Sequence, residues 1–364
     1  MYANLLCCMV VGMIVAAGVK AQTASSAPFY DDKMNLLVYI DAAGKQHPVT
    51  NVKDWEKRRE HILANMQRIM GPLPGADRRV ALDTEVVASE TLAKVTRKKI
   101  MYGSEPGHRV PAYLLIPNEL QGKAPAMLCL HGSSGARGRI AGLGPDYPRY
   151  ALELAERGYV TISPDYIFFG DNTGVDPYKT LGYVSGSMKG IWDHMRAVDL
   201  LQSLPEVDPD RIGCIGVSLG GHNSLYVAAF DQRLKAVVTS SGFDSVFDYM
   251  GGKPGALRAY TQRCYMPLAG SRYGLDPAKF PFDFPEVLGV LAPRSLFVHA
   301  PISDSNFRVD SVKRCVAAAT SVYRLFDAEE RLVAIYPEGG HGFPPEARER
   351  AYQFIDKALE HHRP

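Results

Sequence analysis

The sequence has almost no excess of charge of either sign, since 41 Lys and Arg residues stand against 39 Asp and Glu residues. A protein that holds a polyanion through its summed field needs a clear basic surplus. We therefore expect no nucleic-acid partner. The 46% of apolar residues supply enough material for a sizeable core, which excludes disorder as the dominant state of the 364 residues.

Long apolar runs are absent after the first 20 residues, and nothing there approaches the roughly 20 residues that span a bilayer. The one apolar run, Leu5 to Val19, leads to the small residue Ala21 and predicts a secretory signal peptide, residues 1–21. No Lys or Arg precedes this run, which leaves retention as an uncleaved anchor open. We expect an extracytoplasmic protein, periplasmic or secreted, with no other membrane contact.

Cysteine is scarce and unpatterned. Of the four cysteines beyond residue 21, Cys129 and Cys214 lie in apolar runs typical of core strands, and a pairing of Cys264 with Cys315 is left open. No C-x-x-C, Cys/His ligand spacing or His-Glu-x-x-His motif is present, so we predict no metal. P-loop and dinucleotide fingerprints are also missing, which predicts chemistry without a cofactor.

The hydrophobic pattern changes along the chain. Residues 22 to about 50 are rich in Ser, Ala, Pro, Gly and Asp and are expected to be extended and poorly ordered. A helix is predicted between Trp55 and Met70, where apolar residues recur at spacings of three and four. Residues 80–116 alternate with a period of two and predict an antiparallel meander.

After Pro125, short apolar runs alternate with helical segments. The predicted strands are 126–130, 160–163, 212–216, 236–240, 295–299 and 332–336, and the predicted helices are 150–157, 188–204, 221–230, 309–326 and 345–359. Parallel strands need long crossovers, so this alternation predicts an α/β fold with a mostly parallel, doubly wound sheet. The meander forms its antiparallel edge.

The predicted organisation is a signal peptide (1–21), an N-terminal extension with one helix (22–79) and a catalytic domain (80–364). Within the catalytic domain, only residues 243–293 interrupt the alternation of predicted strands and helices. This stretch is too long for an ordinary connection and is predicted to be a lid-like insertion over the carboxyl ends of the strands.

A candidate nucleophile lies in Gly216-Val217-Ser218-Leu219-Gly220-Gly221, between a predicted strand and a predicted helix. A G-x-S-x-G sequence can occur by chance, but the strand before it and the helix after it are the context of a nucleophile elbow. Gly216 and Gly220 remove side chains where the strand and the helix approach each other. The pattern therefore predicts that the Ser218 hydroxyl is exposed on a strained turn.

A serine nucleophile needs a base, and that base needs an orienting group. His341 follows the last predicted strand, and Asp304 follows the strand before it, which gives the order Ser218, Asp304, His341 expected of this sheet. His131 is the rival base at a strand end. Asp310 is the rival acid, but it is expected to open a helix.

The oxyanion donors are predicted to be the backbone N–H groups of Leu219 and Ser133. Gly132 permits the close approach of the Ser133 loop. His131 is expected to shape this loop by hydrogen bonds to the backbone rather than to act in catalysis.

Several motifs together resemble the α/β-hydrolase superfamily: His131-Gly132, Pro164-Asp165-Tyr166, Asp208-Pro209-Asp210-Arg211-Ile212, Gly216 to Gly221, Asp304 and Gly340-His341-Gly342-Phe343. The chain is most similar to secreted bacterial carbohydrate esterases of the acetyl xylan esterase-like and glucuronoyl esterase-like groups. The segments Asp54 to Arg59 and Met70 to Pro74 share this likeness. Glucuronoyl esterases carry an arginine after the nucleophile, whereas this chain has Leu219. The resemblance therefore favours acetyl esters as the substrate, followed by methyl esters and then by uronoyl esters.

The resemblance implies a secreted serine esterase that removes a short acyl or methyl group from a small sugar or polysaccharide. A prolyl oligopeptidase-like peptidase is an alternative, although only about 60 residues separate Ala21 from Val80, too few for a propeller. A noncatalytic binding protein is a second alternative, disfavoured by the complete triad. Candidates for stacking on a sugar are Tyr166, Trp192, Tyr249, Tyr260, Tyr265 and Tyr273.

Overall fold

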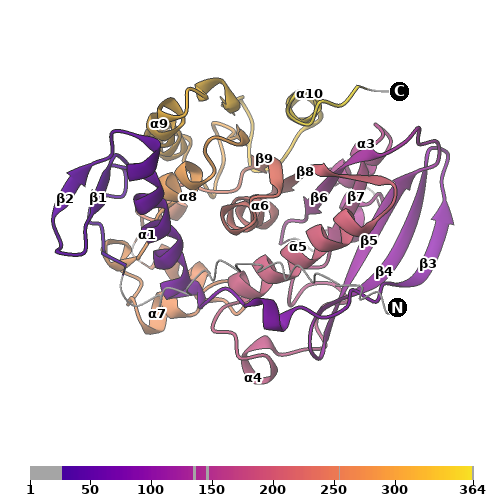
Figure 1. Ribbon diagram of the computed structural model, residues 1–364, viewed down its shortest axis with the longest axis horizontal. Helices are drawn as coiled ribbons and strands as arrows, with labels where there is room; N and C mark the ends of the chain where they lie inside the picture. Colours follow the sequence, from indigo (N-terminus) through magenta and orange to yellow (C-terminus); the bar gives the residue numbers. More distant parts are fainter. Residues whose placement is uncertain (1–26, 134–136, 145–146, 254, 363–364) are drawn as a thin grey trace, which may run out of the picture.

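The computed structural model describes residues 27–133, 137–144, 147–253 and 255–362, so the predicted signal peptide lies outside the described residues. Within them, the core is a nine-stranded sheet in the order β11-β10-β9-β8-β6-β7-β5-β4-β3 (Figure 1). Its strands are β3 (Glu85–Thr91), β4 (Val95–Glu105), β5 (His108–Pro117), β6 (Ala124–Leu130), β7 (Val160–Pro164), β8 (Val207–Val217), β9 (Leu234–Ser240), β10 (Ser295–His299) and β11 (Leu332–Ile335).

The strands from β6 to β11 run parallel, while β5 pairs antiparallel with β7 and continues into the antiparallel meander β5-β4-β3. The predicted fold class is therefore confirmed, including the antiparallel edge. The chain connections from the adjacent strands β6 and β8 run in opposite directions across the sheet. The chain passes from β6 to β7 on one side, and from β8 to β9 on the other. This is a topological switch point, where ligands of open α/β sheets bind at the carboxyl ends of the strands.

Helices cover both faces of the sheet because the strands are apolar on both. On β6, Ala126, Leu128 and Leu130 belong to one core cluster, and Met127 and Cys129 to the other. The first face is covered by α5 (Gly186–Ser203), α6 (Leu219–Phe230), α8 (Phe284–Val290) and α9 (Val309–Leu325), and the second by α3 (Tyr150–Ala155) and α10 (Pro345–Ala358). Shorter helices are α2 (Arg137–Ile140), α4 (Pro177–Thr180) and α7 (Leu268–Ser271).

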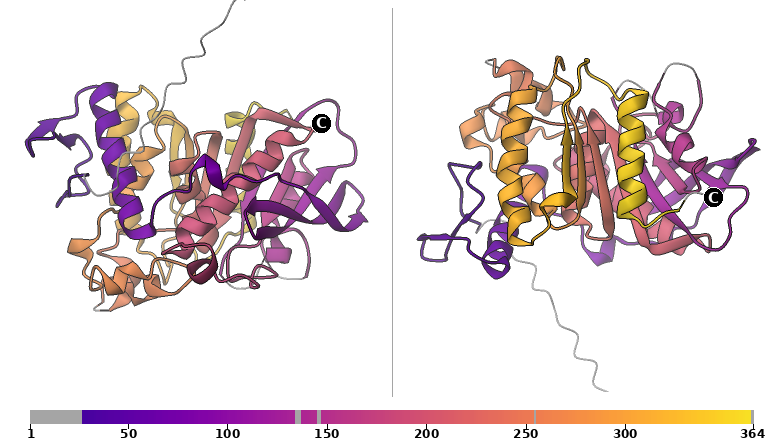
Figure 2. Two further views of the ribbon diagram at one scale, coloured as in Figure 1. Left: turned by 60° about the horizontal axis from the view of Figure 1, so that its bottom comes forward. Right: turned by 90° about the horizontal axis from the view of Figure 1, so that it is seen from above.

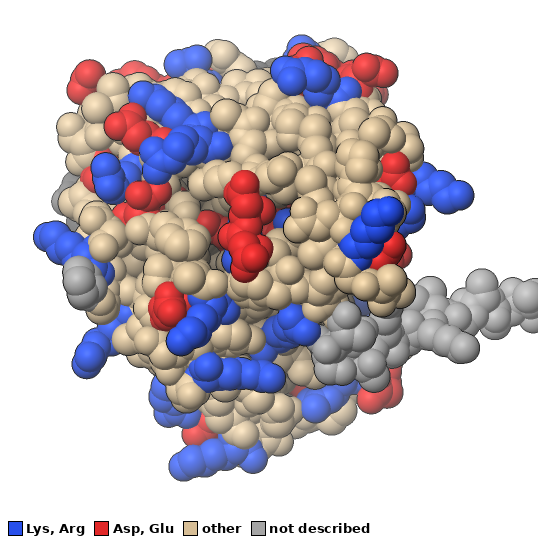
Figure 3. Space-filling model, turned by 90° about the vertical axis from the view of Figure 1, so that its left-hand side faces the viewer, with Lys and Arg blue, Asp and Glu red and all other residues tan. Residues whose placement is uncertain are grey.

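The N-terminal extension is more ordered than its composition predicts. Residues 38–48 form a small hairpin in which β1 (Val38–Ile40) pairs with β2 (Gln46–Pro48), and Tyr30, Leu36 and Val49 are buried. The expectation of a poorly ordered lead-in is therefore wrong for residues 27–50. These side chains are buried because the following helix α1 (Val52–Met70) packs against α8 and α5 (Figure 2). On this side of the molecule, basic and acidic side chains are interspersed (Figure 3).

A chain of buried polar contacts joins this extension to the loop after β9. Arg58 of α1 forms an ion pair with Glu286 of α8, with Nη2 and Oε1 2.6 Å apart and both side chains buried. Glu286 also accepts the backbone N–H of Asp283 at 2.9 Å. The Asp283 carboxylate in turn accepts the Ser245 hydroxyl at 2.6 Å and the Val246 N–H at 3.0 Å.

The segment 243–293 divides into two parts with different roles. Its last part forms α8, which begins with a capping box between Asp283 and Glu286 and packs into the core against α9, α6 and α1. Residues of the earlier part, between Tyr249 and Tyr265, line the pocket beside Ser218. These residues of the earlier part therefore lie at the carboxyl ends of the strands.

Candidate active site

Ser218 occupies a strained joint between β8 and α6. Its backbone has φ +56° and ψ −120°, an unfavourable conformation for a residue with a side chain. A Cβ atom on Gly220 would lie 1.9 Å from the Leu130 carbonyl oxygen, and one on Gly216 would lie 2.2 Å from the Gly220 carbonyl oxygen. The two glycines therefore allow the tight strand-to-helix joint, in the geometry of a nucleophile elbow.

His341 and Asp304 lie together on the loops that follow β11 and β10. The Nδ1 atom of His341 is 3.0 Å from both carboxylate oxygens of Asp304. The Asp304 side chain is 2% exposed and the His341 side chain 26%. The alternative acid Asp310 lies on the exposed first turn of α9 and pairs with Lys313, so the structure does not bring it to His341.

Asp304 is a carboxylate at neutral pH. Burial alone would raise its pKa, but hydrogen bonds from His341 and from the backbone N–H groups of Asn306 and Phe307 outweigh burial. The pKa of Asp304 is therefore lower than its ordinary value. A fixed negative charge facing Nδ1 favours a proton on that nitrogen and leaves Nε2 as the basic atom.

Ser240, which the sequence analysis did not single out, links the Ser218 loop to the His341 loop. Its carbonyl accepts the Ser218 N–H at 2.9 Å, and its hydroxyl donates to the Gly342 carbonyl at 3.0 Å. His299 lies 2.7 Å from the same hydroxyl through Nδ1. Because burial lowers the pKa of His299 to about 4, the ring is neutral and donates its Nδ1–H to Ser240.

The loop after β6 passes directly beside Ser218. His131 accepts the Tyr166 N–H at 3.0 Å through Nε2 and donates to the Gly132 carbonyl at 2.8 Å through Nδ1. A Cβ on Gly132 would lie 3.6 Å from the Ser218 Cβ. Ser133 and Leu219 both line the pocket that contains Ser218, which brings the two predicted oxyanion donors to the same site.

A pocket of about 240 Å³ opens at Ser218. It is lined by Ser133, Ser218, Leu219, His222, Tyr249, Met250, Ala259, Tyr260, Gln262, Tyr265, Asn306 and Phe307. None of these described lining residues is Lys, Arg, Asp or Glu. The pocket is therefore neutral, provided that His222 is uncharged. Burial lowers the pKa of His222 to about 3, so it carries no charge near neutral pH.

Three of the six aromatic candidates from the sequence, Tyr249, Tyr260 and Tyr265, line this pocket. The other three lie elsewhere in the fold: Tyr166 and Trp192 are buried and bonded to backbone carbonyls, and Tyr273 packs near Phe280. His222, Gln262, Asn306 and Phe307 were missed. His222 lies within the predicted helix 221–230, where no pattern marks it as a pocket residue, and polar loop residues such as Gln262 carry no periodic signal.

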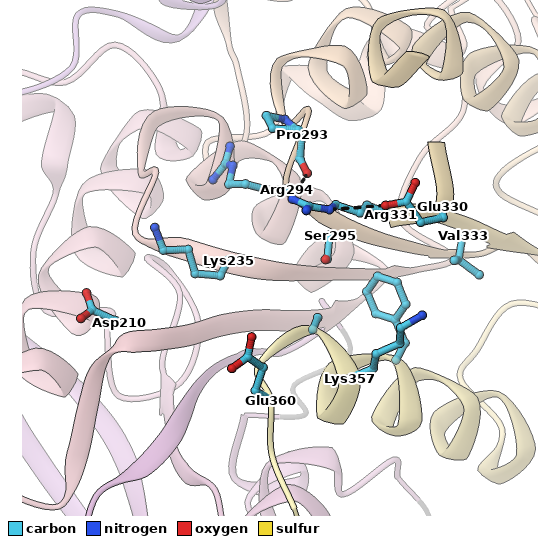
Figure 4. Close-up of a pocket in the computed structure, with 12 residues that line it drawn as sticks. Asp210, Lys235, Pro293, Arg294, Ser295, Glu330, Arg331, Val333, Lys357 and Glu360 are labelled. Atoms are coloured by element: carbon cyan, nitrogen blue, oxygen red, sulfur yellow. Dashed lines mark hydrogen bonds and ion pairs between the residues drawn. The ribbon is translucent and has the colours of Figure 1, made fainter. Parts of the chain in front are cut away.

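A larger hollow of about 710 Å³ lies at the opposite, amino end of the strands (Figure 4). Its half-buried Arg294 donates to the carbonyls of Ala228, Asp231 and Leu234. Arg331 donates to the Pro293 carbonyl and pairs with Glu330. Both arginines are thus bound to the protein itself, and Ser218, His341 and Asp304 lie at the other end of the sheet.

The remaining expectations concern metals, membranes and thiols. The described residues contain no group of three or more potential metal ligands. None of the described helices is long and apolar enough to cross a bilayer. Cys129, Cys214, Cys264 and Cys315 are all buried free thiols, so the structure contains no Cys264–Cys315 disulfide.

Comparison with known proteins adds to this geometry. Residues 77–251 match the family model of acetyl xylan esterases, and residues 178–327 match that of fungal glucuronyl esterases. The Bacillus subtilis hydrolase YtaP is 27% identical over 303 residues, which cover 80% of this chain and 97% of YtaP. Dipeptidyl-peptidase 5 of Porphyromonas gingivalis is 28% identical over 51% of this chain but only 27% of its own length.

Among solved structures, the glucuronoyl esterase of Solibacter usitatus superposes with a TM-score of 0.68 at 21% identity, covering 92% of this chain and 99% of that one. The strand order and the elbow are thus those of the α/β-hydrolase fold. Over the matched segments the chain is similar to acetyl xylan esterases and to glucuronyl esterases, which supports its assignment as a carboxylic ester hydrolase.

Proposed function

We propose that this enzyme removes a short acyl group, above all acetyl, from a carbohydrate, with a methyl ester as the next choice. The observation that carries this proposal is the pocket of about 240 Å³ beside Ser218, which the described residues line without a charged side chain. Pockets for drug-sized ligands begin at about 300 Å³. A pocket below that size suits a single sugar ring or a small acyl group.

The proposed roles follow from the geometry. Ser218 Oγ attacks the ester carbonyl while His341 Nε2 takes its proton, and Asp304 holds the Nδ1–H of His341 at 3.0 Å. The backbone N–H groups of Leu219 and Ser133 stabilise the oxyanion, each contributing about 3 kcal/mol. His341 then protonates the leaving alcohol, and water releases the acyl group from Ser218 by the same steps in reverse.

The choice of acetyl over uronoyl esters rests on the charges available. A uronate carboxylate buried without a cation would lose its hydration without compensation. Leu219 follows the nucleophile in this chain, and the described pocket residues supply no Lys or Arg. The names of both related families refer to esters of carbohydrates, which supports a sugar as the alcohol.

We also propose that the enzyme acts outside the cytoplasm, on the basis of the apolar run from Leu5 to Val19 and Ala21 after it. Mass spectrometry of protein from the native host should find a mature N-terminus near Gln22. An intact Met1 in the cytoplasmic fraction would contradict export, and an intact Met1 in the membrane fraction would indicate an anchor.

The test of the esterase proposal compares three reactions of the purified enzyme. We expect release of acetate from acetylated xylan, weaker release of methanol from a methyl-esterified polysaccharide and no cleavage of a proline-containing peptide. Ser218→Ala serves as the control for each. Peptide cleavage without ester release would overturn the proposal in favour of a peptidase. Binding of xylan without any release would indicate a noncatalytic protein.

A further inference from the structure

Two consecutive serines at the carboxyl end of β9, Ser240 and Ser241, both bind the residue that follows His341. The Oγ atom of Ser240 lies 3.0 Å from the Gly342 carbonyl oxygen, and the Oγ atom of Ser241 lies 3.2 Å from the same oxygen. The Gly342 N–H also donates to Ser241 Oγ, with the nitrogen and the oxygen 3.4 Å apart. Both serines are buried. The backbone directly after His341 is therefore held by the end of β9.

The direction of the hydrogen bonds to this carbonyl follows from the groups themselves. A backbone carbonyl oxygen has two lone pairs and no proton, so it accepts from a hydroxyl and cannot donate to one. Ser241 reaches the Gly342 carbonyl whichever ring nitrogen of His299, 2.7 Å from Ser240 Oγ, carries the proton. The attachment of the His341 loop to β9 therefore does not depend on the tautomer of a histidine.

Ser241 is held in an unfavourable backbone conformation. Its φ of +43° lies in the left-handed region, which residues with a side chain seldom adopt. Its N–H donates to the His299 carbonyl at 2.9 Å, which ties it to the neighbouring strand β10. Strain of this kind persists where the surrounding structure enforces it, and it is concentrated at functional sites. Here it lies beside Ser240, whose carbonyl accepts the Ser218 N–H at 2.9 Å.

We infer that Ser240 and Ser241 are positioning residues that set the place of His341 relative to Ser218. The Ser240 backbone binds the backbone of the proposed nucleophile, and the two hydroxyl groups bind the backbone beside the proposed base. The end of one strand thus holds both groups in register. A displacement of about 1 Å in such a pair costs about 100-fold in rate. The inference rests on the proposed function, to which it adds two positioning residues.

The experiment separates positioning from folding through variants of the two serines. Ser241→Gly removes the hydroxyl and also relieves the strain, because glycine adopts a positive φ without a steric penalty. Ser241→Ala removes the hydroxyl and keeps the strain, and Ser240→Ala removes the other hydroxyl. Thr161→Val is the matched control. The Thr161 hydroxyl is buried near the start of β7, at the amino end of the sheet, and donates to the Ala151 carbonyl at 3.0 Å.

Three quantities are measured for each variant: kcat and KM on phenyl acetate, the rate at which a fluorophosphonate probe labels Ser218, and the temperature of thermal unfolding. Each single serine variant should lower kcat and the labelling rate about three- to tenfold, as expected for one lost hydrogen bond, with KM changed by less than about twofold. The double variant Ser240→Ala/Ser241→Gly should lower both rates about 30-fold or more. Thr161→Val should leave both rates unchanged.

Ser241→Gly should unfold at a higher temperature than Ser241→Ala and yet lose as much kcat, because the hydroxyl and not the strain relief affects His341. Activity that follows the unfolding temperature from variant to variant, an unchanged kcat in the double variant, or an equal fall with Thr161→Val would overturn the inference while leaving the esterase proposal intact. A folded wild-type protein that neither hydrolyses phenyl acetate nor reacts with the probe would contradict the proposed function, and the inference would fall with it.

Discussion

The hollow at the amino ends of the strands measures about 710 Å³, and the pocket at their carboxyl ends about 240 Å³. The larger one contains Arg294 and Arg331, but backbone carbonyls and Glu330 already bind these cations. The smaller one contains no described charged residue, yet Ser218 lies in its wall on a strained turn. Strain at Ser218, rather than size, therefore distinguishes the end of the sheet at which we propose that the chemistry takes place.

The largest expected effect separates the two ends directly. Ser218→Ala should lower kcat for acetyl ester hydrolysis by about five to six orders of magnitude, because no other group takes over the attack. Lys235→Ala, at the amino end, should leave kcat unchanged. Steady-state kinetics on phenyl acetate measure both. Substantial activity of Ser218→Ala, or a comparable loss of activity with Lys235→Ala, would show that the chemistry does not take place at the carboxyl end of the sheet.

The second prediction concerns the acid that orients His341. Asp304→Asn should reduce kcat about 10⁴-fold, because the amide no longer holds the imidazole in the tautomer with Nε2 free. Asp310→Asn is the matched control, since Asp310 is exposed and pairs only with Lys313. The same phenyl acetate assay compares the two variants. A damaging Asp310→Asn with an active Asp304→Asn would require the orienting role to be reassigned.

The third prediction tests the tight joint that strains Ser218. Gly220→Ala places a methyl group 1.9 Å from the Leu130 carbonyl, so β6 and α6 must move apart. We expect a loss of about 3 kcal/mol or more of unfolding free energy and a marked fall in activity. Gly342→Ala, where nothing lies within 4 Å of the added Cβ, should leave stability nearly unchanged. Chemical denaturation gives both values, and equal effects would show that the joint is not constrained.

The smallest expected effect is a dependence of folding stability on pH, caused by Asp244 at the carboxyl end of the sheet. Asp244 follows β9, is fully buried and accepts the Arg308 N–H at 3.0 Å. Burial first, with the charges of Asp248, Asp283 and Asp304, raises its pKa to about 8. The unfolded state releases this proton near pH 4, so the contribution of Asp244 to stability falls as pH rises from about 4 to 8.

Asp244→Asn mimics the protonated carboxyl and removes this dependence. The melting temperature of Asp244→Asn minus that of wild type should therefore increase by at least about 2 °C between pH 5 and pH 8. Asp310→Asn, which is exposed, should show no such trend. A difference that stays constant with pH, or shrinks as pH rises, would contradict a protonated Asp244.

The sequence predicted those parts of the molecule that depend on local patterns. The sheet, its antiparallel edge and the helices α3, α5, α6, α9 and α10 follow from hydrophobic periodicity. The short helices α4, α7 and α8 were not predicted, and α7 and α8 lie in a stretch rich in Gly, Pro and aromatics. Ser218 was found from its flanking glycines, and His341 and Asp304 from their places after successive strands. Their catalytic roles remain predictions, although the 3.0 Å contact between His341 and Asp304 supports them.

Features that depend on distant partners could not be predicted. Tyr30 and Leu36 are buried because α1 and α8 lie over them, more than 200 residues apart in sequence, and composition alone suggested an unordered segment. His222 lies in a predicted helix, and the sequence does not show that the insertion places Tyr260 against it. Gln262 and Asn306 reach the pocket from loops, where no pattern of spacing marks them.

The buried Arg58–Glu286 pair has a consequence for how the protein can be divided. A shortened gene that begins near residue 80 would remove Arg58 and leave Glu286 as a buried carboxylate without its cation. That carboxylate lies in the same chain of contacts as Asp283 and Ser245, directly after Gly242 and Asp244 at the pocket end of the sheet. The extension is thus joined to the α/β core by a buried ion pair, and its removal would leave a buried charge without its partner.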